Sequence, residues 1–313
     1  MNQVIDQNIT ERYSIYNGDC IDVMNDLPAN SIHYSVFSPP FAELYAYSNS
    51  ERDLGNAKNY DEFFVHFRYV AELLFYVLKP GRLVTVHCVD IPAMKERDGY
   101  IGLKDFPGDI IRLFQAQGFI YHSRHIIWKD PLIEATRTKA LGLMYKQTLK
   151  DSAMCRAGLP DYLITMRKPG ENEEPVSHKE HTGFGHYVGT DTINNHGLKY
   201  AHEVWQKYAS PVWMDIRQTH TLNKMAAREE KDEKHICPLQ LDTIERALVL
   251  WSKENDIVLS PFAGIGSEGY VALKLKRRFV GVELKESYYR EMVKNLDAAQ
   301  DESQQVLFRP AHE

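Results

Sequence analysis

The chain has 313 residues and a net charge of −6, and 43% of its residues are hydrophobic while 26% are charged. These values are typical of a globular protein with one large domain or two smaller ones. The charge has the wrong sign for a protein that coats nucleic acid indiscriminately. No apolar run approaches the roughly 18–20 residues of a membrane helix, the amino terminus lacks a signal-peptide pattern, and the four cysteines form no metal-type pair. We therefore expect a cytoplasmic protein with reduced thiols, no bound metal and no membrane partner.

Strand-like and helix-like patterns alternate through the first half of the chain. The predicted strands are 13–17, 31–37, 82–89, 119–128 and 160–168, and the predicted helices are 19–28, 61–78 and 108–118. Strands that alternate with helices of this length indicate a largely parallel α/β sheet. We expect the strand at 160–168 to lie at the edge of that sheet.

The middle of the chain has a different character. Between residues 124 and 168 there are nine Lys or Arg and four acids, and residues 129–158 have no regular period. This basic segment is typical either of a local site for a polyanion or of a solvated charged face. Residues 169–233 are polar and aperiodic, which is too long for a simple loop in a compact domain and indicates an inserted module.

The α/β alternation resumes in the last part of the chain. We predict helices at 239–253, 263–276 and 285–300, strands at 256–262 and 277–284, and a frayed tail at 301–313. Between the two strands, Phe262-Ala263-Gly264-Ile265-Gly266 forms a glycine turn, and the second strand ends at Glu283. Glycines allow a ligand to approach the backbone and the N–H groups of the next helix, while an acid at this position can bind a ribose diol. The turn lacks a third glycine at dinucleotide spacing, so it favours a nucleoside cofactor without a pyrophosphate, of which S-adenosylmethionine is the most common.

Two motifs together resemble the DNA amino-methyltransferases. "SPPF" at 38–41 is similar to their catalytic motif, "SPFAGIGS" at 260–267 is similar to their cofactor motif, and "LKPGR" at 78–82 resembles the turn before their fifth strand. The catalytic motif comes first in this chain, which is the permuted order of the β group of these enzymes. The resemblance covers roughly residues 13–168 and 235–297. It implies a circularly permuted, doubly wound, mostly parallel seven-stranded Rossmann-like sheet with an inserted DNA-recognition region.

The resemblance also implies which residues form the site. The catalytic group is Ser38, Pro39, Pro40 and Phe41; the first two accept hydrogen bonds from the amine, and Phe41 stacks on a base flipped out of the duplex. S-adenosylmethionine, which becomes S-adenosylhomocysteine, is expected to contact Asp19, Pro238, Gln240, Pro261, Phe262, Ala263, Gly264, Gly266, Ser267 and Glu283. Asp19 is equally well explained as a helix N-cap. Ser260 departs from the family pattern, in which an Asp commonly stands at this position.

Double-stranded DNA is the implied substrate, and the domain organisation follows from the motifs. Residues 1–168 are expected to form the catalytic half of the methyltransferase domain, 169–234 the target-recognition region, and 235–313 the cofactor-binding half. The basic residues expected to contact DNA phosphates are Arg124, Lys129, Arg137, Lys139, Lys146, Lys150 and Arg156. The histidines of residues 170–234 have no metal-type spacing, and residues 47–60 are either a mobile lid or an ordinary connection.

Several alternatives stay open at this point. Ser-Pro-Pro-aromatic favours cytosine N4 as the target over adenine N6, but the chemistry of the two amines does not decide between them. Methylation at cytosine carbon 5 is disfavoured because no cysteine follows a proline in the required context. A protein methyltransferase and a catalytically silent DNA-binding module are less favoured. A bacterial or a phage-encoded enzyme, a monomer or a homodimer, and a cognate restriction endonuclease as a partner are all compatible with the sequence.

Overall fold

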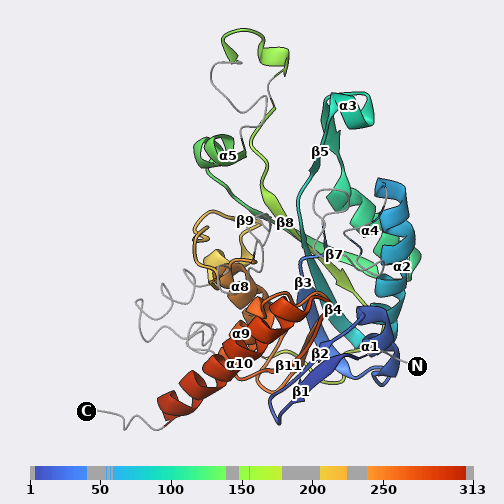
Figure 1. Cartoon of the computed structure of the whole chain (residues 1–313), viewed down its shortest axis with the longest axis vertical. Coiled ribbons are helices and arrows are strands. Elements are labelled where there is room, and N and C mark those ends of the chain that lie inside the picture. The colour runs from blue at the N-terminus through green and yellow to red at the C-terminus, as the bar shows by residue number, and fades with distance from the viewer. Residues whose placement is uncertain are drawn as a thin grey trace, which may run out of the picture.

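One mixed sheet organises the whole chain (Figure 1). The computed structural model describes residues 4–40, 54, 57, 59–138, 148–154, 156–177, 205–223 and 238–307. The strand order in the sheet is β1-β2-β11-β10-β3-β4-β8-β7-β9. The strands are β1 (Asp6–Ile9), β2 (Tyr13–Asn17), β3 (Ile32–Phe37), β4 (Leu78–Cys88), β7 (Ile120–Ile127), β8 (Asp161–Arg167), β9 (Val212–Trp213), β10 (Ile257–Ser260) and β11 (Arg278–Glu283).

The expected mostly parallel sheet forms the middle of this arrangement. Strands β2, β11, β10, β3 and β4 pair in parallel, and β8 runs antiparallel to both of its neighbours. Together with β7 these are the seven strands of the predicted sheet. The described sheet has nine strands, because β1 pairs with β2 and β9 pairs with β7 at the two edges. These edge strands are four and two residues long, which is too short to give a sequence pattern.

The prediction that residues 160–168 form an edge strand is wrong. β8 lies between β4 and β7, and its residues are almost all buried. Its Thr165 hydroxyl lies 3.0 Å from the hydroxyl of Thr85 on β4, so even its polar side chain has a partner inside the sheet. Four consecutive buried residues, 163–166, are typical of a strand that is covered on both faces.

Six of the described helices cover the two faces of the sheet. Helices α1 (Cys20–Asp26), α2 (Tyr60–Val77) and α4 (Phe106–Ala116) contribute to one core cluster, and α8 (Leu241–Trp251), α9 (Ser267–Lys274) and α10 (Glu286–Leu307) contribute to the other. The first three begin where Asp19, Asn59 and Asp105 accept hydrogen bonds from backbone N–H groups of the first turn, as N-caps do. Helix α10 continues to Leu307, so the tail is not frayed from residue 301 as predicted.

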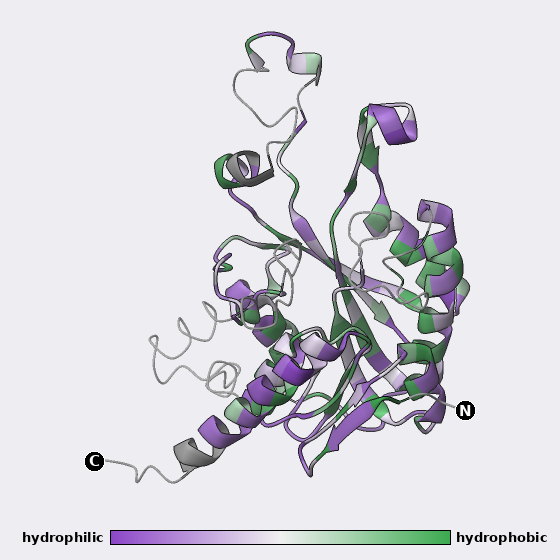
Figure 2. Cartoon of the chain, viewed as in Figure 1, coloured by the Kyte–Doolittle hydropathy of each residue, from purple (hydrophilic) through white to green (hydrophobic). Residues whose placement is uncertain are grey.

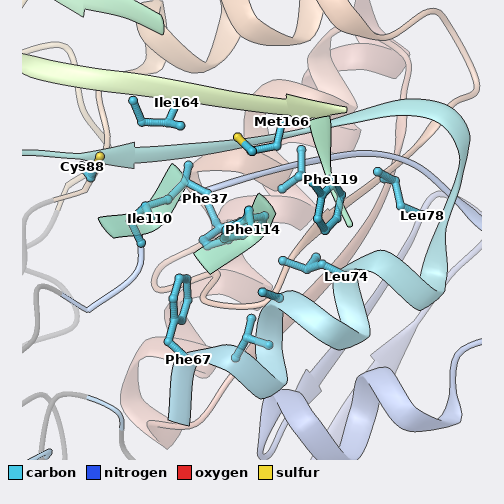
Figure 3. Close-up of a cluster of buried hydrophobic side chains, with 14 of the residues drawn as sticks. Phe37, Phe67, Leu74, Leu78, Cys88, Ile110, Phe114, Phe119, Ile164 and Met166 are labelled. Atoms are coloured by element: carbon cyan, nitrogen blue, oxygen red, sulfur yellow. The ribbon is translucent and has the colours of Figure 1, made fainter. Parts of the chain in front are cut away.

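The strands supply alternate residues to the two cores. On β3, Tyr34 and Val36 belong to the α8–α10 side, whereas Phe37 packs with α2 and α4. Figure 3 shows the cluster on the α2 and α4 side, in which Phe37, Phe67 and Phe114 lie between the sheet and the helices. In Figure 2 the hydrophobic colour follows the inner faces of these helices, while the outer face of α10 is hydrophilic. None of the described helices is both long and apolar enough to span a bilayer.

Two projections leave the sheet at the carboxyl ends of its strands (Figure 1). The chain leaves β4 into a hairpin of β5 (Ile91–Ala93) and β6 (Gly102–Lys104) that carries α3 (Lys95–Asp98) at its tip. It leaves β7 into α5 (Pro131–Thr138) and the 3₁₀ turn η3 (Ser152–Met154), and it returns as β8. Because β4 and β7 run in the same direction, both projections stand on the same edge of the sheet.

An ionic cluster ties three strands together at the opposite edge. The guanidinium of Arg82 on β4 donates to the backbone oxygen of His33 on β3 at 2.8 Å and to the buried carboxylate of Asp256, next to β10. His33, Asp256 and Glu174 carry ligand atoms within 4.8 Å of one another. Arg82 and Lys79 pair with the two carboxylates, so the cluster is an internally neutralised ion-pair network.

A buried histidine next to the projections makes stability sensitive to acid. The ring of His125 on β7 lies 4.7 Å from the ring of Trp213 and 5.5 Å from that of Trp251. Burial, assisted by the nearby His122, lowers the pKa of His125 to about 4. The unfolded chain therefore binds a proton more readily than the folded chain. The resulting stability is fully present above about pH 6.5 and is lost as the pH falls toward 4.

The substitution His125→Gln should flatten this part of the stability profile, because glutamine does not titrate. The midpoint of thermal unfolding, measured by circular dichroism from pH 7 to pH 4.5, should fall less steeply in the variant than in the wild type. The exposed His66 on α2 provides a control, since His66→Gln should keep the wild-type slope. Parallel slopes for all three proteins would contradict the prediction.

Candidate active site

The pairing of β3 with β10 brings the two sequence motifs together. The register places Tyr34 opposite Val258 and Ser35 opposite Leu259 in parallel, and the Ser35 hydroxyl donates to the backbone oxygen of Leu259 at 2.9 Å. Both strands therefore end at the same edge, where the rings of Phe37 and Phe262 are 5.6 Å apart. The Ser-Pro-Pro corner and the glycine turn are thus neighbours, although about 220 residues separate them in the sequence.

The glycine turn follows β10 directly and is held by backbone hydrogen bonds. Ala263 donates its N–H to the oxygen of Val282 at 2.9 Å, and Gly266 donates to the oxygen of Ala263 at 2.8 Å. Gly264 and Gly266 have φ values of +53° and +87°, which favour glycine. A side chain at Gly266 would collide with Met292, whereas the Cβ position at Gly264 faces open space. Gly266 is therefore required by packing, and Gly264 leaves a free approach to the backbone.

Glu283 stands at the end of β11, beside this turn. Its carboxylate accepts the N–H of Gly264 at 2.9 Å and the N–H of Lys285 at 2.8 Å. The end of β2 lies on its other side, where the Asn17 amide donates to the Glu283 backbone oxygen at 2.9 Å. The predicted acid is thus fixed in orientation at the carboxyl ends of three adjacent strands.

The other predicted cofactor residues occupy different positions around this edge. Asp19 is an N-cap, and its carboxylate accepts the N–H of Ile21 at 2.8 Å. Burial raises the pKa of the neighbouring Cys20 thiol, and the carboxylates of Asp19 and Glu283 each add to this effect. Pro261 is buried, and Ser267 begins α9. Pro238 and Gln240 precede α8, and the Gln240 amide donates to Gln218 at 3.4 Å, so their role toward a cofactor stays a prediction.

The Ser-Pro-Pro corner, predicted to be catalytic, begins one residue beyond β3. Pro39 is buried and Ser38 is partly buried, while Phe41 lies outside the described residues. Because Phe37 pairs with Val86, Ser38 comes next to His87 on β4. The Ser38 Oγ lies 3.1 Å from His87 Nδ1, and His87 Nε2 lies 3.1 Å from Asp161 Oδ2.

This histidine–aspartate pair was not predicted from the sequence. His87 lies near the carboxyl end of β4, and Asp161 opens β8. Each looks ordinary alone, but both lie at strand ends on the edge where α/β sheets bind ligands. A titratable residue at the carboxyl end of β4, the strand that follows β3 along the chain, is the signal that could have identified His87.

The predicted phosphate contacts have different surroundings. Arg124 is exposed and its guanidinium lies 5.4 Å from the centre of the Tyr162 ring, and Lys150 is also exposed. Lys129 is mostly buried, and its ammonium lies 2.6 Å from Asp161, so this cation is engaged within the protein. Burial lowers the pKa of Arg156. Lys139, Lys146 and the side chain of Arg137 lie outside the described residues.

Comparisons with known proteins agree with this arrangement. The family model of the N6/N4-type DNA methylases matches residues 32–294. The chain is 25% identical over 299 residues to the type II methyltransferase M.BglII of Bacillus subtilis, covering 92% of this chain and 70% of that protein. It is 24% identical over 281 residues to the type II methyltransferase M1.MboII of Moraxella bovis, covering 88% and 94%.

Solved structures share the fold. The cytosine-N4-specific PvuII DNA methyltransferase superposes with a TM-score of 0.61 at 17% identity, over 97% of this chain and 96% of that one. A Thermus thermophilus protein of the DNA modification methylase type, in complex with S-adenosyl-L-methionine, gives a TM-score of 0.63 at 21% identity, over 92% and 96%. With a family model that matches most of the chain and a sheet that joins both motifs, this protein belongs to the N6/N4 DNA methylase family.

Proposed function

We propose that this DNA methyltransferase transfers a methyl group from S-adenosylmethionine to N4 of a flipped-out cytosine in duplex DNA. The observation that carries the proposal is the contact between the two motifs across β3 and β10, with 5.6 Å between the rings of Phe37 and Phe262. A serine rather than an acid at position 38 supports cytosine as the target. The type II names of the relatives support a cognate restriction endonuclease as a partner.

The role of the Ser-Pro-Pro corner follows from the chemistry of the amine. The lone pair of an exocyclic amine is delocalised into the base, so the enzyme must hold the amine hydrogens to turn that lone pair toward the methyl group. We assign this role to Ser38 Oγ and the backbone oxygen of Pro39, because the rigid prolines exclude that oxygen from a sheet ladder. Phe41 would stack on the extruded base and offset part of the unstacking cost.

The glycine turn fits the cofactor that supplies the methyl group. The open position at Gly264 leaves room for the methionine end of the cofactor, and the oriented carboxylate of Glu283 suits a ribose diol. Two buried polar atoms at this edge, Ser260 Oγ and Asn17 Oδ1, have no hydrogen-bond partner among the described residues. Buried polar atoms are ordinarily paired, so these atoms favour a polar ligand here.

A second carboxyl group lies near Glu283 and is held neutral. Glu268, in the first turn of α9, is 4% exposed, and burial together with the nearby Glu283 raises its pKa to about 8. When the pKa of a carboxyl group is higher in the folded state than in the unfolded state, the protein loses stability as the pH rises from the lower pKa to the higher one. The loss should therefore run from about pH 4.5 to pH 8. Glu268 thus reduces the stability of the folded protein near neutral pH. Because the proposed cofactor carries cationic groups, a carboxyl group kept here in spite of this loss supports a role for Glu268 in the site.

The substitution Glu268→Gln should remove this loss, since glutamine is neutral throughout. Between pH 5 and pH 8, the free energy of unfolding of the variant should rise relative to the wild type by about 3–5 kcal/mol, measured by urea denaturation at each pH. The exposed Glu72 on α2 is the matched control, because Glu72→Gln should leave the pH dependence unchanged. Equal losses in Glu268→Gln and the wild type would contradict the prediction.

The target base can be identified directly. Purified enzyme is incubated with labelled S-adenosylmethionine and unmethylated duplex genomic DNA, and the nucleosides of the digested DNA are analysed by mass spectrometry. We expect N4-methylcytosine, and we expect Pro39→Ala and Phe41→Ala variants that still fold to lose it. N6-methyladenine would replace the cytosine assignment, and methyl transfer to protein but to no DNA would overturn the proposal.

The region that recognises DNA is assigned to residues 129–158, which include the projection after β7, and to residues 169–234. The exposed Arg124 and Lys150 are its phosphate contacts within the described part of the chain. DNA binding should weaken steeply with salt, because each phosphate contact releases condensed counterions.

The substitutions Arg124→Ala and Lys150→Ala should each reduce the slope of log K against log salt concentration by about 1, measured by fluorescence anisotropy on duplex DNA. Arg278→Ala, at the exposed amino end of β11 on the opposite edge of the sheet, should leave the slope unchanged. A slope that stays at the wild-type value in the first two variants would remove these residues from the interface.

A further inference from the structure

Four polar side chains, each close to the next, form a row that ends at Ser38, the serine proposed to hold the amine. Ser38 Oγ lies 3.1 Å from His87 Nδ1, and His87 Nε2 lies 3.1 Å from Asp161 Oδ2. The other oxygen of Asp161 lies 2.6 Å from the ammonium of Lys129. His87 is 8% exposed and Asp161 is 3% exposed, so the row runs from the catalytic corner into the protein interior.

The charges of this row determine where its protons lie. Burial tends to raise the pKa of Asp161, but His87 and Lys129 outweigh that effect, and the pKa is lowered overall. Asp161 is therefore a carboxylate, and its charge, 3.1 Å from His87 Nε2, favours the tautomer of His87 with the proton on Nε2. When the His87 imidazole is neutral, this tautomer leaves its lone pair on Nδ1, which lies 3.1 Å from Ser38 Oγ and accepts the hydroxyl proton. With its proton directed toward His87, Ser38 Oγ presents its remaining lone pair to an amine hydrogen.

We infer that His87, oriented by Asp161, is a positioning residue that takes the proton released by methylation, through Ser38. The inference rests on the proposed role of Ser38 in holding the amine. A neutral amine that gains a methyl group becomes cationic and must lose one proton before the product is complete. Ser38 and His87 supply a path for that proton, and the Asp161 carboxylate stabilises the positive charge that His87 then carries.

Atoms and charges balance through the step. The amine nitrogen forms its bond to the methyl carbon with its own lone pair, and the electron pair of the broken carbon–sulfur bond stays on the sulfur. The methylated nitrogen then gives a proton to Ser38 Oγ while Ser38 gives its hydroxyl proton to His87 Nδ1. His87 becomes an imidazolium paired with the Asp161 carboxylate. It returns its proton to solvent after the product leaves.

The charged surroundings favour a histidine that changes its protonation state here. Among the described residues, Asp161 faces His87 directly, and Lys129 balances part of the charge of Asp161. The other titratable groups around the end of β4 are Cys88 and Asp90 on the same segment, Tyr162 on β8, and Arg124 on β7. Asp161 is the anion in contact with the ring, so it is the group that stabilises the imidazolium.

The test compares His87→Gln with the wild type in single-turnover methylation. The enzyme is in excess over a DNA duplex that the wild-type enzyme methylates. Glutamine can accept the Ser38 hydrogen bond but cannot take a proton. The rate of the chemical step should fall by about 10²-fold, while the dissociation constants for S-adenosylmethionine and DNA stay within twofold. The pH dependence of this rate should also change, because glutamine has no proton to exchange. His122→Gln is the matched control, because His122 contacts Ser123 at 2.9 Å on the exposed part of β7 and should keep the wild-type rate.

A second measurement does not depend on activity. In the free wild-type protein labelled with ¹⁵N-histidine, NMR should show His87 protonated on Nε2 and unprotonated on Nδ1, with the signal assigned by its loss in His87→Gln. Asp161→Asn should weaken this tautomer preference. A His87 ring with its proton on Nδ1 at neutral pH would overturn the inferred proton relay from Ser38 to His87, even if every variant lost activity.

The outcomes separate the relay from the proposed function. If Ser38→Ala keeps the wild-type single-turnover rate, the proposed role of Ser38 is wrong and the relay falls with it. If Ser38→Ala is slow but His87→Gln keeps both the wild-type rate and its pH profile, the relay is wrong and the role of Ser38 stands. If His87→Gln and Asp161→Asn are each slow and the double variant is no slower than His87→Gln alone, the two residues act as one unit, as inferred.

Discussion

The parallel pairing of β3 with β10 is the interaction on which the site depends. The residues that follow a strand lie at the edge of the sheet where that strand ends. The register of two adjacent parallel strands therefore determines how close the segments after them lie. With Ser35 opposite Leu259, the Ser-Pro-Pro corner and the glycine turn emerge side by side. A strand inserted between β3 and β10 would separate the two motifs by about 5 Å more. The chemistry therefore depends on backbone pairing before it depends on any side chain.

The sequence was sufficient for the elements and motifs whose signals are local. The apolar periodicity of α2, the cap at Asp19, and the two glycines with positive φ all depend on near neighbours in the chain. The relation between the two motifs was also predictable, but only because their combination resembles a known family. Physical reasoning from the residues alone reached a nucleoside site and a rigid corner, without joining them.

The relations that escaped prediction are contacts between distant segments. The placement of β8 inside the sheet depends on pairing with β4 and β7, and no property of residues 160–168 alone decides which strands they join. Lys129 appeared to be a free cation because its partner, Asp161, lies 32 positions away in the sequence. Glu268 lies in the first turn of α9, and only its burial beside Glu283, which depends on the folded structure, raises its pKa to about 8. Each of these side chains acquires its properties from tertiary structure.

The strand order also constrains how the chain acquires its structure during synthesis. β2 and β3 are made first, yet in the finished sheet β11 and β10 lie between them. Until residues 257–283 leave the ribosome, two strands of the amino-terminal part have no native neighbour on their facing edges. Unpaired edges of apolar strands invite association with other chains, and pairings of such long sequence separation form slowly. The nascent chain is thus exposed to aggregation for most of its translation, and residues 257–283 complete a sheet that the amino-terminal strands cannot form alone.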